Sequence, residues 1–437
     1  MRVLLVGGGG REHAIAEALA RGGAELYAVM RNRNPGIARL SREFLLADET
    51  DGGRVAGFGK RMGAEMAVIG PEGPLANGVA DALAEKGIPT VGPTKRLAQI
   101  EASKAFMRGL MARHKIPGSL RYGAFSGLSE ALDFLERFDS PVAIKPSGLT
   151  GGKGVKVVGD QLKDLKEARD YLREVMEGGI GGGEVVIEER AEGEEFTLQA
   201  FVDGRRVVPM PLVQDHKRAF EGDEGPNTGG MGAYSDADGL LPFLAAGDRR
   251  AAEEIMRDTV VALMAETGEE YKGILYGQFM LGRELKLIEF NCRFGDPEAM
   301  NVLSILKTNF VEVCQGIVDG RLRDAAFEPK ATVSKYVVPQ GYGLKPLSGK
   351  RIFVDEERIR KEGAILYYAA VNEDGGAIYT TSSRSVGVVG VHETIAGAER
   401  IAERAVGGIR GEGIYHRADI GTEALVGKRV RNLRKAL

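Results

Sequence analysis

The residues best suited to act together chemically are Glu289, Asn291 and Arg293, which are spaced two apart. On an extended backbone, side chains at this spacing point to one face, so Glu289 and Asn291 offer two oxygen ligands to one hard cation such as Mg²⁺. Arg293 could hold an anion beside that cation through its planar guanidinium. Glu289 and Asn291 alone would more simply belong to a half-buried strand with surface ion pairs, so the prediction depends on the rest of the chain.

A rigid strand is needed to aim these side chains, and the residues before them predict one. The apolar residues alternate, with Leu285 and Leu287 expected on one face and Ile288 and Phe290 on the other. Residues 274–280 predict a second strand, antiparallel to the first.

A glycine loop forms a second candidate site. Residues 141–146 predict a strand that contains Lys145. The loop that follows carries Gly151, Gly152, Lys153 and Gly154. Such a loop can cover phosphates with backbone N–H donors while Lys145 supplies positive charge. It is not a Walker A loop, because no Gly-Lys-Ser/Thr leads into a helix, and a hairpin without a ligand is the alternative interpretation.

Residues 1–102 alternate between short apolar strands and helical segments, which predicts a parallel sheet with ligands at the carboxyl ends of its strands. After the first strand, Gly7 to Gly10 lead into a helix whose N-terminus can bind an anion. The dinucleotide fingerprint Gly-x-Gly-x-x-Gly fails, because Glu12 or His13 occupies its last position. A phosphate site is therefore as plausible as an empty turn, and an NAD-dependent dehydrogenase is disfavoured.

Two further segments place carboxylates where a ligand could meet them. Glu72 follows a predicted strand and could accept hydrogen bonds from a sugar hydroxyl or an amine. Residues 184–189 predict a strand that leads into a carboxylate-rich turn extending to Glu195. That turn could present backbone groups to a base and a carboxylate to a ribose. In both places ordinary solvated glutamates are the alternative.

Residues 214–218 (Gln-Asp-His-Lys-Arg) and 225–234 predict a long loop region with few apolar anchors. Loops of that length are functional or disordered, and the mixture of charge and glycine favours a loop that contacts substrate.

The pattern becomes β-rich after about Arg323. The predicted strands are 331–338, 364–371, 377–381 and 384–391, followed by a closing helix at 394–409. We expect this part to cap the site and find no catalytic constellation in it.

Composition excludes several classes of function. A formal net charge of −3 provides no basic surface for nucleic acid. No apolar run has transmembrane length, and the first residues do not have the pattern of a signal peptide. The two cysteines, Cys292 and Cys314, cannot form a disulfide framework. With 437 residues, 43% of them hydrophobic, the chain is expected to form several domains of a cytoplasmic globular protein.

Several of these segments, taken in order, resemble the ATP-grasp superfamily. They are Lys104 after its predicted N-cap Ser103, Lys145, the glycine loop, the turn from Glu188 to Glu195, and Glu289-Phe290-Asn291. Within that superfamily the joint pattern is similar to the phosphoribosylamine-glycine ligase family. The segments that carry this second resemblance are Gly9-Gly10-Arg11-Glu12-His13, Gly70-Pro71-Glu72, Ser103-Lys104-Ala105-Phe106, Gln214-Asp215-His216-Lys217-Arg218, Gly225 to Tyr234, and Glu289 to Glu298.

The resemblance implies an α/β and α+β multidomain fold. A Rossmann-like N-terminal domain would span residues 1–102 and bind substrate. An ATP-grasp domain would span 103–325, with a small subdomain at about 120–190. A C-terminal β-rich domain would span 326–437.

The resemblance also implies the reaction. ATP, glycine and 5-phosphoribosylamine would give glycinamide ribonucleotide, ADP and phosphate through a glycyl phosphate intermediate in de novo purine biosynthesis, with Mg²⁺ or Mn²⁺ as the metal. This chemistry needs no enzyme nucleophile, which agrees with the lack of a convincing Ser/His/Asp or Cys/His set in the sequence. Other purine-pathway enzymes are suggested as partners, and neither nucleic acid nor a membrane is.

Residue roles follow from the resemblance position by position. The ATP-binding residues would be Lys104, Lys145, Gly151, Gly152, Lys153, Gly154, Glu188, Glu189, Ala191 and Glu195. The metal ligands would be Gln278, Glu289 and Asn291. The catalytic pair Asp215 and Arg293 would hold the amino and carboxylate ends of glycine. The remaining substrate contacts would come from Gly9, Gly10, Glu12, Glu72 and Lys217.

Two other interpretations stay open. Another ATP-grasp carboxylate-amine ligase of purine metabolism would share the ATP-binding residues but should lack the segments 215–218 and 227–234. A nucleotide-binding regulatory protein that has lost catalysis should have lost the metal pair, whereas Glu289 and Asn291 are both present.

Overall fold

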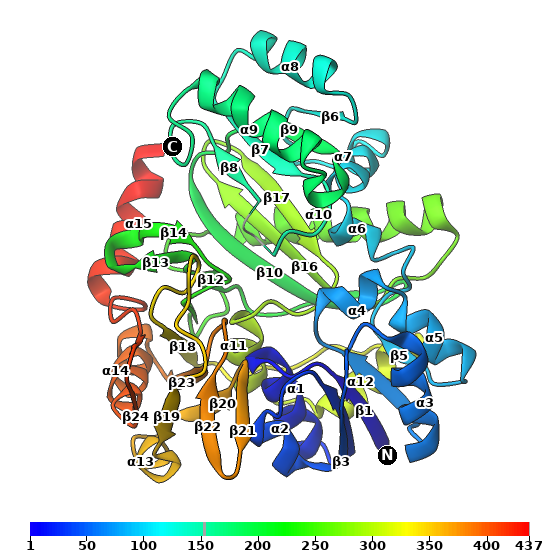
Figure 1. The fold of residues 1–437 in the computed structure, drawn as a ribbon, viewed down its shortest axis with the longest axis vertical. Coiled ribbons are helices and arrows are strands. Elements are labelled where there is room, and N and C mark those ends of the chain that lie inside the picture. Colours follow the sequence, from blue (N-terminus) through cyan, green and yellow to red (C-terminus); the bar gives the residue numbers. More distant parts are fainter. Residues whose placement is uncertain (152–153, 437) are drawn as a thin grey trace.

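The computed structural model describes residues 1–151 and 154–436. Its N-terminal part is a five-stranded parallel sheet in the order β3-β2-β1-β4-β5, drawn in blue in Figure 1. The strands are β1 (Arg2–Val6), β2 (Glu25–Met30), β3 (Ser41–Leu46), β4 (Met66–Ile69) and β5 (Thr90–Val91). The helices between them are α1 (Gly10–Arg21), α2 (Pro35–Leu40), α3 (Gly52–Met62), α4 (Glu72–Ala76) and α5 (Val79–Glu85). Because β1 and β4 are neighbours, the turns that follow them meet at one edge of the sheet.

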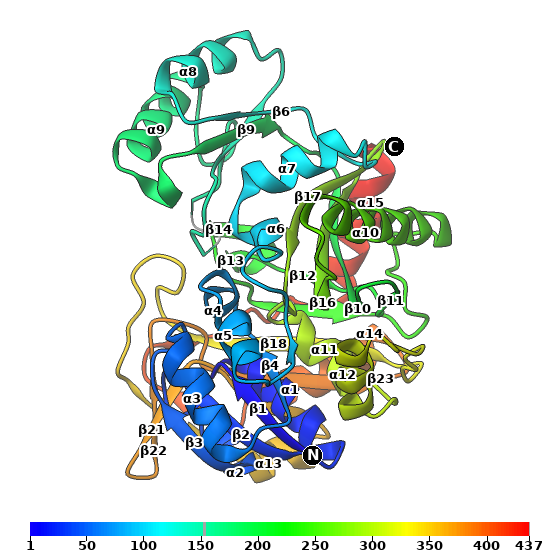
Figure 2. The same ribbon diagram turned by 90° about the vertical axis from the view of Figure 1, so that its right-hand side faces the viewer.

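A small antiparallel sheet stands away from this part, at the top of Figure 2. Its order is β6-β9-β7-β8, from β6 (Tyr122–Phe125), β7 (Val142–Pro146), β8 (Lys156–Val157) and β9 (Val185–Glu189). Helices α8 (Leu128–Arg137) and α9 (Leu165–Glu177) and the 3₁₀ turn η1 (Ile180–Gly182) accompany it, and the unit has a hydrophobic core of its own.

Two helices connect the N-terminal sheet to the small sheet. They are α6 (Gln99–Ala102) and α7 (Lys104–Arg113). Helix α7 begins where the sequence predicts, because Ser103 Oγ accepts a hydrogen bond from the Phe106 N–H at 3.1 Å.

The central sheet is antiparallel, with the order β11-β10-β16-β17. Its strands are β10 (Glu194–Asp203), β11 (Val207–Pro209), β16 (Lys272–Leu281) and β17 (Leu285–Asn291), and the helices near it are α10 (Ala246–Thr267), α11 (Glu298–Ser304) and α12 (Phe310–Asp319). The predicted antiparallel pairing of the two strands that carry Gln278 and Glu289 is confirmed. The strand with Glu289 lies at the edge of this sheet.

Two further sheets contain the C-terminal strands, and the first of them also includes two strands from the middle of the chain. The six-stranded sheet has the order β12-β15-β18-β23-β20, with β25 paired to β18, and the four-stranded sheet has the order β21-β22-β19-β24. The strands of the first are β12 (Gln214–Asp215), β15 (Gly232–Ser235), β18 (Ala331–Pro339), β20 (Ile365–Tyr368), β23 (Val386–His392) and β25 (Ile414–Tyr415). Those of the second are β19 (Arg351–Val354), β21 (Val371–Asp374), β22 (Ala377–Thr380) and β24 (Ile409–Gly411). The helices are α13 (Glu356–Lys361), α14 (Ile395–Val406) and α15 (Glu423–Ala436).

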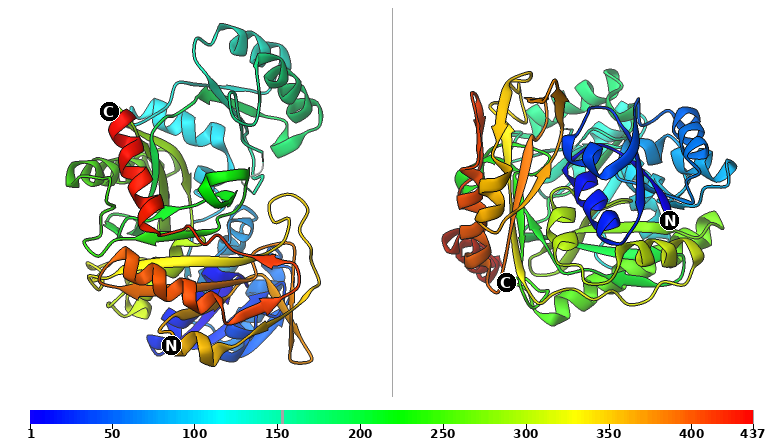
Figure 3. Two further views of the ribbon diagram at one scale, coloured as in Figure 1. Left: turned by 90° about the vertical axis from the view of Figure 1, so that its left-hand side faces the viewer. Right: turned by 90° about the horizontal axis from the view of Figure 1, so that it is seen from below.

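Two predictions about this part are wrong. Residues 214–234 are not one long loop, because they contain β12, the hairpin β13 (Arg218–Phe220) and β14 (Glu224–Asn227) with the 3₁₀ turn η2 (Glu221–Asp223), and β15. Strand β15 is buried and pairs with β18, a partner that the local sequence cannot indicate. The chain also does not close with the helix at 394–409, since α15 follows it and packs beside β10, as the left view of Figure 3 shows.

The predicted fold class is confirmed: a parallel N-terminal sheet precedes a core of antiparallel sheets and a β-rich C-terminal part. Within the described residues, no helix is long and apolar enough to cross a membrane.

Candidate active site

A β-bulge decides which side chains of β17 face the site. Gln278 pairs with Glu289, but the next residue of β16 pairs with Leu287, so Ile288 is an extra residue. The bulge places Leu287 and Phe290 together in the core, where they are 0% and 1% exposed. The prediction that these two side chains lie on opposite faces is therefore wrong, since strict alternation ends at the bulge.

Gln278 and Glu289 lie opposite each other on the same face of the sheet. The Nε2 of Gln278 donates a hydrogen bond to Glu195 Oε2 at 2.6 Å, while its Oε1 is buried without a partner in the described part of the chain. A buried amide oxygen without a donor is a position that a cation can fill. Asn291, two residues after Glu289, uses its Oδ1 to accept a hydrogen bond from Arg293 at 3.2 Å.

The electrostatics of this face also fit a cation bound to phosphates. Burial alone would raise the pKa of Glu289, but nearby basic side chains lower it, so the carboxylate is charged at neutral pH. The three lysines involved are Lys217, Lys145 and Lys104. Among the described residues no three His, Cys, Asp or Glu side chains gather as metal ligands, so a cation here would depend on the amide oxygens beside Glu289.

The two lysines predicted to bind phosphate differ in their surroundings. Lys104 donates a hydrogen bond from Nζ to the Gly148 carbonyl at 3.1 Å, and burial lowers its pKa. Lys145 is 5% exposed and forms an ion pair with Glu188. Glu188 also accepts a hydrogen bond from Arg108 Nε at 2.8 Å, so its carboxylate holds Lys145 instead of being free for a ligand. Arg108 was not among the predicted site residues.

The polar segment that begins at Asp215 does reach the central sheet. Lys217 Nζ lies 3.5 Å from Glu195 Oε2 and 3.9 Å from Asp215 Oδ2. Burial raises the pKa of Asp215 to about 7, although Lys217 acts in the opposite direction. The structure thus brings Asp215, Lys217, Glu195 and Gln278 together.

Arg293 is enclosed by carboxylates. Its Nη2 lies 2.7 Å from Glu101 Oε1 and its Nε lies 3.3 Å from Glu72 Oε2. Glu101 also accepts a hydrogen bond from the Cys292 N–H at 2.8 Å. Glu101 was not among the predicted site residues, and its place before Ser103 in the chain was the only signal in the sequence.

The glycine turn after β1 is filled by the glutamate of α1. The Gly9 N–H donates a hydrogen bond to Glu12 Oε2 at 2.7 Å, and Arg11 Nε donates to Glu12 Oε1 at 2.6 Å. A Cβ added to Gly70 would lie 2.2 Å from that Oε1, so glycine is required there. Glu72 lies 3.9 Å from Arg11, which brings the two predicted substrate-binding turns together.

The C-terminal part reaches this turn. The Tyr336 hydroxyl donates a hydrogen bond to Asp296 Oδ1 at 2.5 Å, and Arg384 Nη2 donates to Asp296 Oδ2 at 2.9 Å. A Cβ on Gly9 would lie 3.9 Å from the same Oδ2. Although no constellation was predicted in this part, it supplies two of the groups that fix Asp296 beside the turn.

The remaining predicted residues are less informative. Glu189 Oε2 accepts a hydrogen bond from Arg121 Nε at 3.0 Å at an exposed edge, and the Gly154 carbonyl accepts one from the Tyr171 hydroxyl at 2.6 Å. Gly151 and Ala191 lie in the loops after β7 and β9. Gly152 and Lys153 lie outside the described residues.

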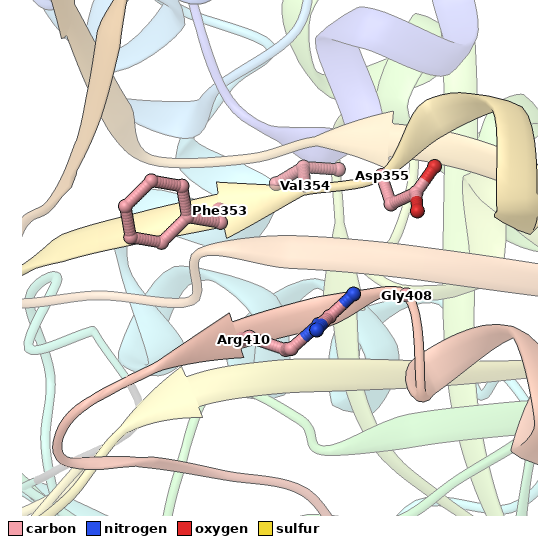
Figure 4. A pocket seen from close by; sticks show the side chains of 5 residues that line it. All are labelled: Phe353, Val354, Asp355, Gly408 and Arg410. Carbon is pink, nitrogen blue, oxygen red and sulfur yellow. The ribbon is translucent and has the colours of Figure 1, made fainter.

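A cavity elsewhere in the molecule is not part of this site. Figure 4 shows Phe353, Val354 and Asp355 on one side of it and Gly408 and Arg410 on the other. These residues belong to β19, β24 and the segments beside them, and none of the predicted site residues that the structure describes lines the cavity.

Comparison with known proteins shows the class of enzyme to which this chain belongs. Residues 102–299 match the ATP-grasp (A) domain of phosphoribosylglycinamide synthetase, so the chain is an ATP-grasp ligase, a class that uses ATP with a divalent metal. Residues 1–101 match the N domain and residues 332–423 the C domain of the same synthetase. The chain therefore belongs to the phosphoribosylglycinamide synthetase family.

Relatives of full length agree with this assignment. The chain is 56% identical to a phosphoribosylamine–glycine ligase of Methanocaldococcus jannaschii and 54% identical to one of Methanothermobacter thermautotrophicus, with 99% of each chain covered in both cases. Its fold is similar to the crystal structure of phosphoribosylamine–glycine ligase from Thermotoga maritima, with a TM-score of 0.80 at 28% identity, over 96% of this chain and 100% of that one.

Proposed function

We propose that this protein joins glycine to 5-phosphoribosylamine, forming glycinamide ribonucleotide, ADP and phosphate in de novo purine biosynthesis. The relatives named for this reaction match the chain over almost its whole length. The observation that carries the proposal is the Oε1 of Gln278, which lies beside Glu289 on a face surrounded by lysines and has no partner among the described residues. Such a face suits a cation that is itself bound to ATP phosphates.

The metal ligands in this proposal are Gln278, Glu289 and Asn291, with Mg²⁺ or Mn²⁺ as the metal. The metal supplies charge neutralisation of the ATP phosphates when it is bound. Asn291 would exchange its hydrogen bond to Arg293 for the cation. That exchange would free Arg293 to meet the carboxylate of glycine.

The lysines and the loops beside them would bind ATP. Lys104 and Lys145 lie close enough to Glu289 to affect its pKa, so the phosphates would meet both lysines near the metal ligands. The glycine loop, including Gly151 to Gly154, would cover the phosphates with backbone donors. The segment from Glu188 through Glu189 to Ala191 would receive the adenine, and Glu195 the ribose.

The chemistry requires that a carboxylate be activated before an amine can displace one of its oxygens. The glycine carboxylate would attack the γ-phosphate of ATP, releasing ADP and forming glycyl phosphate. The amine of phosphoribosylamine would then attack the acyl carbon, and phosphate would leave. Asp215 would hold the glycine ammonium and Arg293 its carboxylate, so both residues act mainly by positioning.

Phosphoribosylamine would bind at the edge of the parallel sheet. Gly9, Gly10 and Glu12 follow β1, and Glu72 follows β4, so both turns face the same edge. Lys217 would extend this contact toward the glycine. We place the domain boundaries at 102/103 and 325/326. The buried, unpaired Cys292 and Cys314 support a reducing cytoplasmic location.

The test is phosphate release from Mg-ATP with glycine, with and without freshly generated phosphoribosylamine, while nucleotide products are identified. The proposal predicts ADP and phosphate only when both co-substrates are present, with glycinamide ribonucleotide formed in equal amount. AMP as a product, or turnover that is indifferent to glycine, would mean that the chain is an ATP-grasp ligase with another substrate.

A further inference from the structure

Arg108 is an arginine of α7 that is completely buried beneath the candidate ATP site. Its guanidinium contacts two other segments of the chain at once, β9 and β17. Nε donates to Glu188 Oε2 at 2.8 Å, Nη1 donates to the Leu287 carbonyl at 3.0 Å, and Nη2 donates to the Ile288 carbonyl at 2.9 Å. Burial of a cation is costly unless hydrogen bonds and an opposite charge compensate it, so these contacts indicate a specific role.

The two carbonyls belong to the bulge of β17. β17 is the edge strand of its sheet. On the side that faces α7, no strand in the described part of the chain pairs with it. A bulge also removes local ladder contacts and leaves carbonyls without partners. Arg108 supplies donors to both carbonyls at the position where the alternation of side chains changes. It therefore stabilises the bulge that turns Glu289 toward the site.

The third contact links Arg108 to the phosphate-binding lysine. Glu188 is shared between Arg108 and Lys145, and all three side chains are almost fully buried. Two cations and one carboxylate leave the group with a net charge of +1. Without Arg108, Glu188 would neutralise Lys145 completely, and Lys145 would no longer offer net positive charge to the ATP phosphates.

We propose that Arg108 is a positioning residue that couples the metal ligands on β17 to Lys145. It thereby holds the groups that bind the cation and the groups that bind the ATP phosphates in the correct relative position. Arg108 touches no substrate itself and acts through Ile288 and Glu188. The inference rests on the proposed roles of Glu289 and Lys145 in binding Mg-ATP. It concerns the requirement for Mg²⁺ and ATP, and leaves the glycine contacts unchanged.

The experiment compares Arg108→Met and Arg108→Lys with the wild type, measuring phosphate release as Mg²⁺, ATP and glycine are varied in turn. The matched control is Arg113→Met, because Arg113 lies on the same helix but is exposed and pairs with Glu266 at the surface. We expect Arg108→Met to raise the Mg²⁺ requirement about 10- to 100-fold, as loss of groups that orient metal ligands does, with the glycine KM unchanged. Arg113→Met should match the wild type in all three titrations.

Arg108→Lys keeps the charge but cannot reach Glu188 and both carbonyls together, so we expect an intermediate Mg²⁺ requirement. Thermal unfolding will show whether Arg108→Met folds. If it does not, Arg108→Lys is the variant that tests the inference. A double variant with Glu188→Gln should regain part of the ATP binding lost in Arg108→Met, because removal of the carboxylate restores the net positive charge at Lys145. A folded Arg108 variant whose Mg²⁺ and ATP titrations coincide with the wild type, or whose main defect is in glycine KM, would overturn the inference.

Failure of the proposed function would look different. If the wild type does not consume glycine, the reaction has been assigned wrongly. Binding of Mg-ATP, measured by calorimetry on the same variants, would still test Arg108. Equal affinity of the wild type and Arg108→Lys for Mg-ATP would contradict the coupling, whatever the second substrate is.

Discussion

The candidate site has a metal end, around Gln278 and Glu289, and a paired end, around Arg293 and Asp296. The two ends differ in how many of their polar groups already have partners within the protein. At the metal end, Gln278 Oε1 has no partner in the described part of the chain, and Lys217 lies 3.5 Å or more from its two carboxylates. At the other end, Arg293 contacts Glu101 at 2.7 Å, and Asp296 is fixed by Tyr336 and Arg384. Unpaired groups mark where a ligand must supply the missing contact, whereas paired groups form the frame around it.

This difference separates two kinds of residue that look alike in the sequence. Glu289 and Glu101 are both glutamates in the site, but nearby basic groups lower the pKa of Glu289, whereas burial raises that of Glu101. Glu289 is therefore available as a charged ligand. Glu101 can stay buried only because it is paired with Arg293. Substitutions at the metal end should affect activity, and substitutions at the paired end should first affect stability.

Glu289→Ala should have the largest effect. Removal of the charged ligand should lower turnover by at least about 100-fold, comparable to loss of a principal electrostatic contact in other enzymes. The thermal unfolding midpoint should stay close to that of the wild type. Turnover is measured as ADP formation with both co-substrates. Glu284→Ala is the control, since Glu284 is an exposed carboxylate just before β17 that pairs with Lys286 at 2.9 Å. Normal activity in Glu289→Ala would contradict the assignment of Glu289 as a metal ligand.

Arg293→Met should lower stability strongly as well as activity. It leaves the buried Glu101 without its cation, which costs roughly 3–5 kcal/mol, while the partly exposed Glu72 keeps Arg11 nearby. Urea unfolding measures this loss. Adding Glu101→Gln in the same chain should restore part of the stability but not the activity. A stable Arg293→Met protein would show that the paired end is not a frame. In the folded fraction, the requirement for glycine should rise far more than that for ATP.

Asp215→Asn should stabilise the protein at high pH while impairing glycine binding. The pKa of Asp215 is raised from its ordinary value to about 7, so the folded state binds this proton more tightly than the unfolded state. The stability contributed by the protonated carboxyl is therefore present at low pH and is lost as pH rises from about 4 to about 7. Asparagine removes this dependence. The gain of Asp215→Asn over the wild type, measured by urea unfolding, should grow through that pH window and then stay constant. A constant difference from pH 4 to 8 would contradict the raised pKa.

Ser103→Ala should have the smallest effect. Loss of the N-cap of α7 should cost about 1 kcal/mol of stability. Because the Lys104 N–H donates to the Ser147 carbonyl at 3.0 Å, loosening the start of α7 should also raise the ATP KM slightly. Asp164→Ala is the matched control, since Asp164 caps α9 in the small sheet unit. Its stability loss should be similar, without a change in ATP KM. Equal ATP KM values in the two variants would argue against a role for the start of α7.

The sequence predicted those features that depend on local pattern. The alternating N-terminal strands and helices, the cap at Ser103 and the pairing of the strands with Gln278 and Glu289 are all found in the structure. The bulge at Ile288 could not be predicted, because it depends on how β16 pairs with β17. Arg108 looks like an ordinary helix arginine until segments 80 and 179 residues away fold around it. Whether a polar side chain has a hydrogen-bond partner within the protein likewise depends on segments that are distant in the sequence.

The most direct test of the proposed reaction follows the oxygen of glycine. Glycine labelled with ¹⁸O in both carboxylate oxygens is supplied with Mg-ATP and phosphoribosylamine, and the released phosphate is analysed by mass spectrometry. Attack of the carboxylate on the γ-phosphate predicts that each phosphate carries one ¹⁸O atom from glycine. Phosphate without ¹⁸O, formed together with glycinamide ribonucleotide, would contradict activation of glycine as an acyl phosphate.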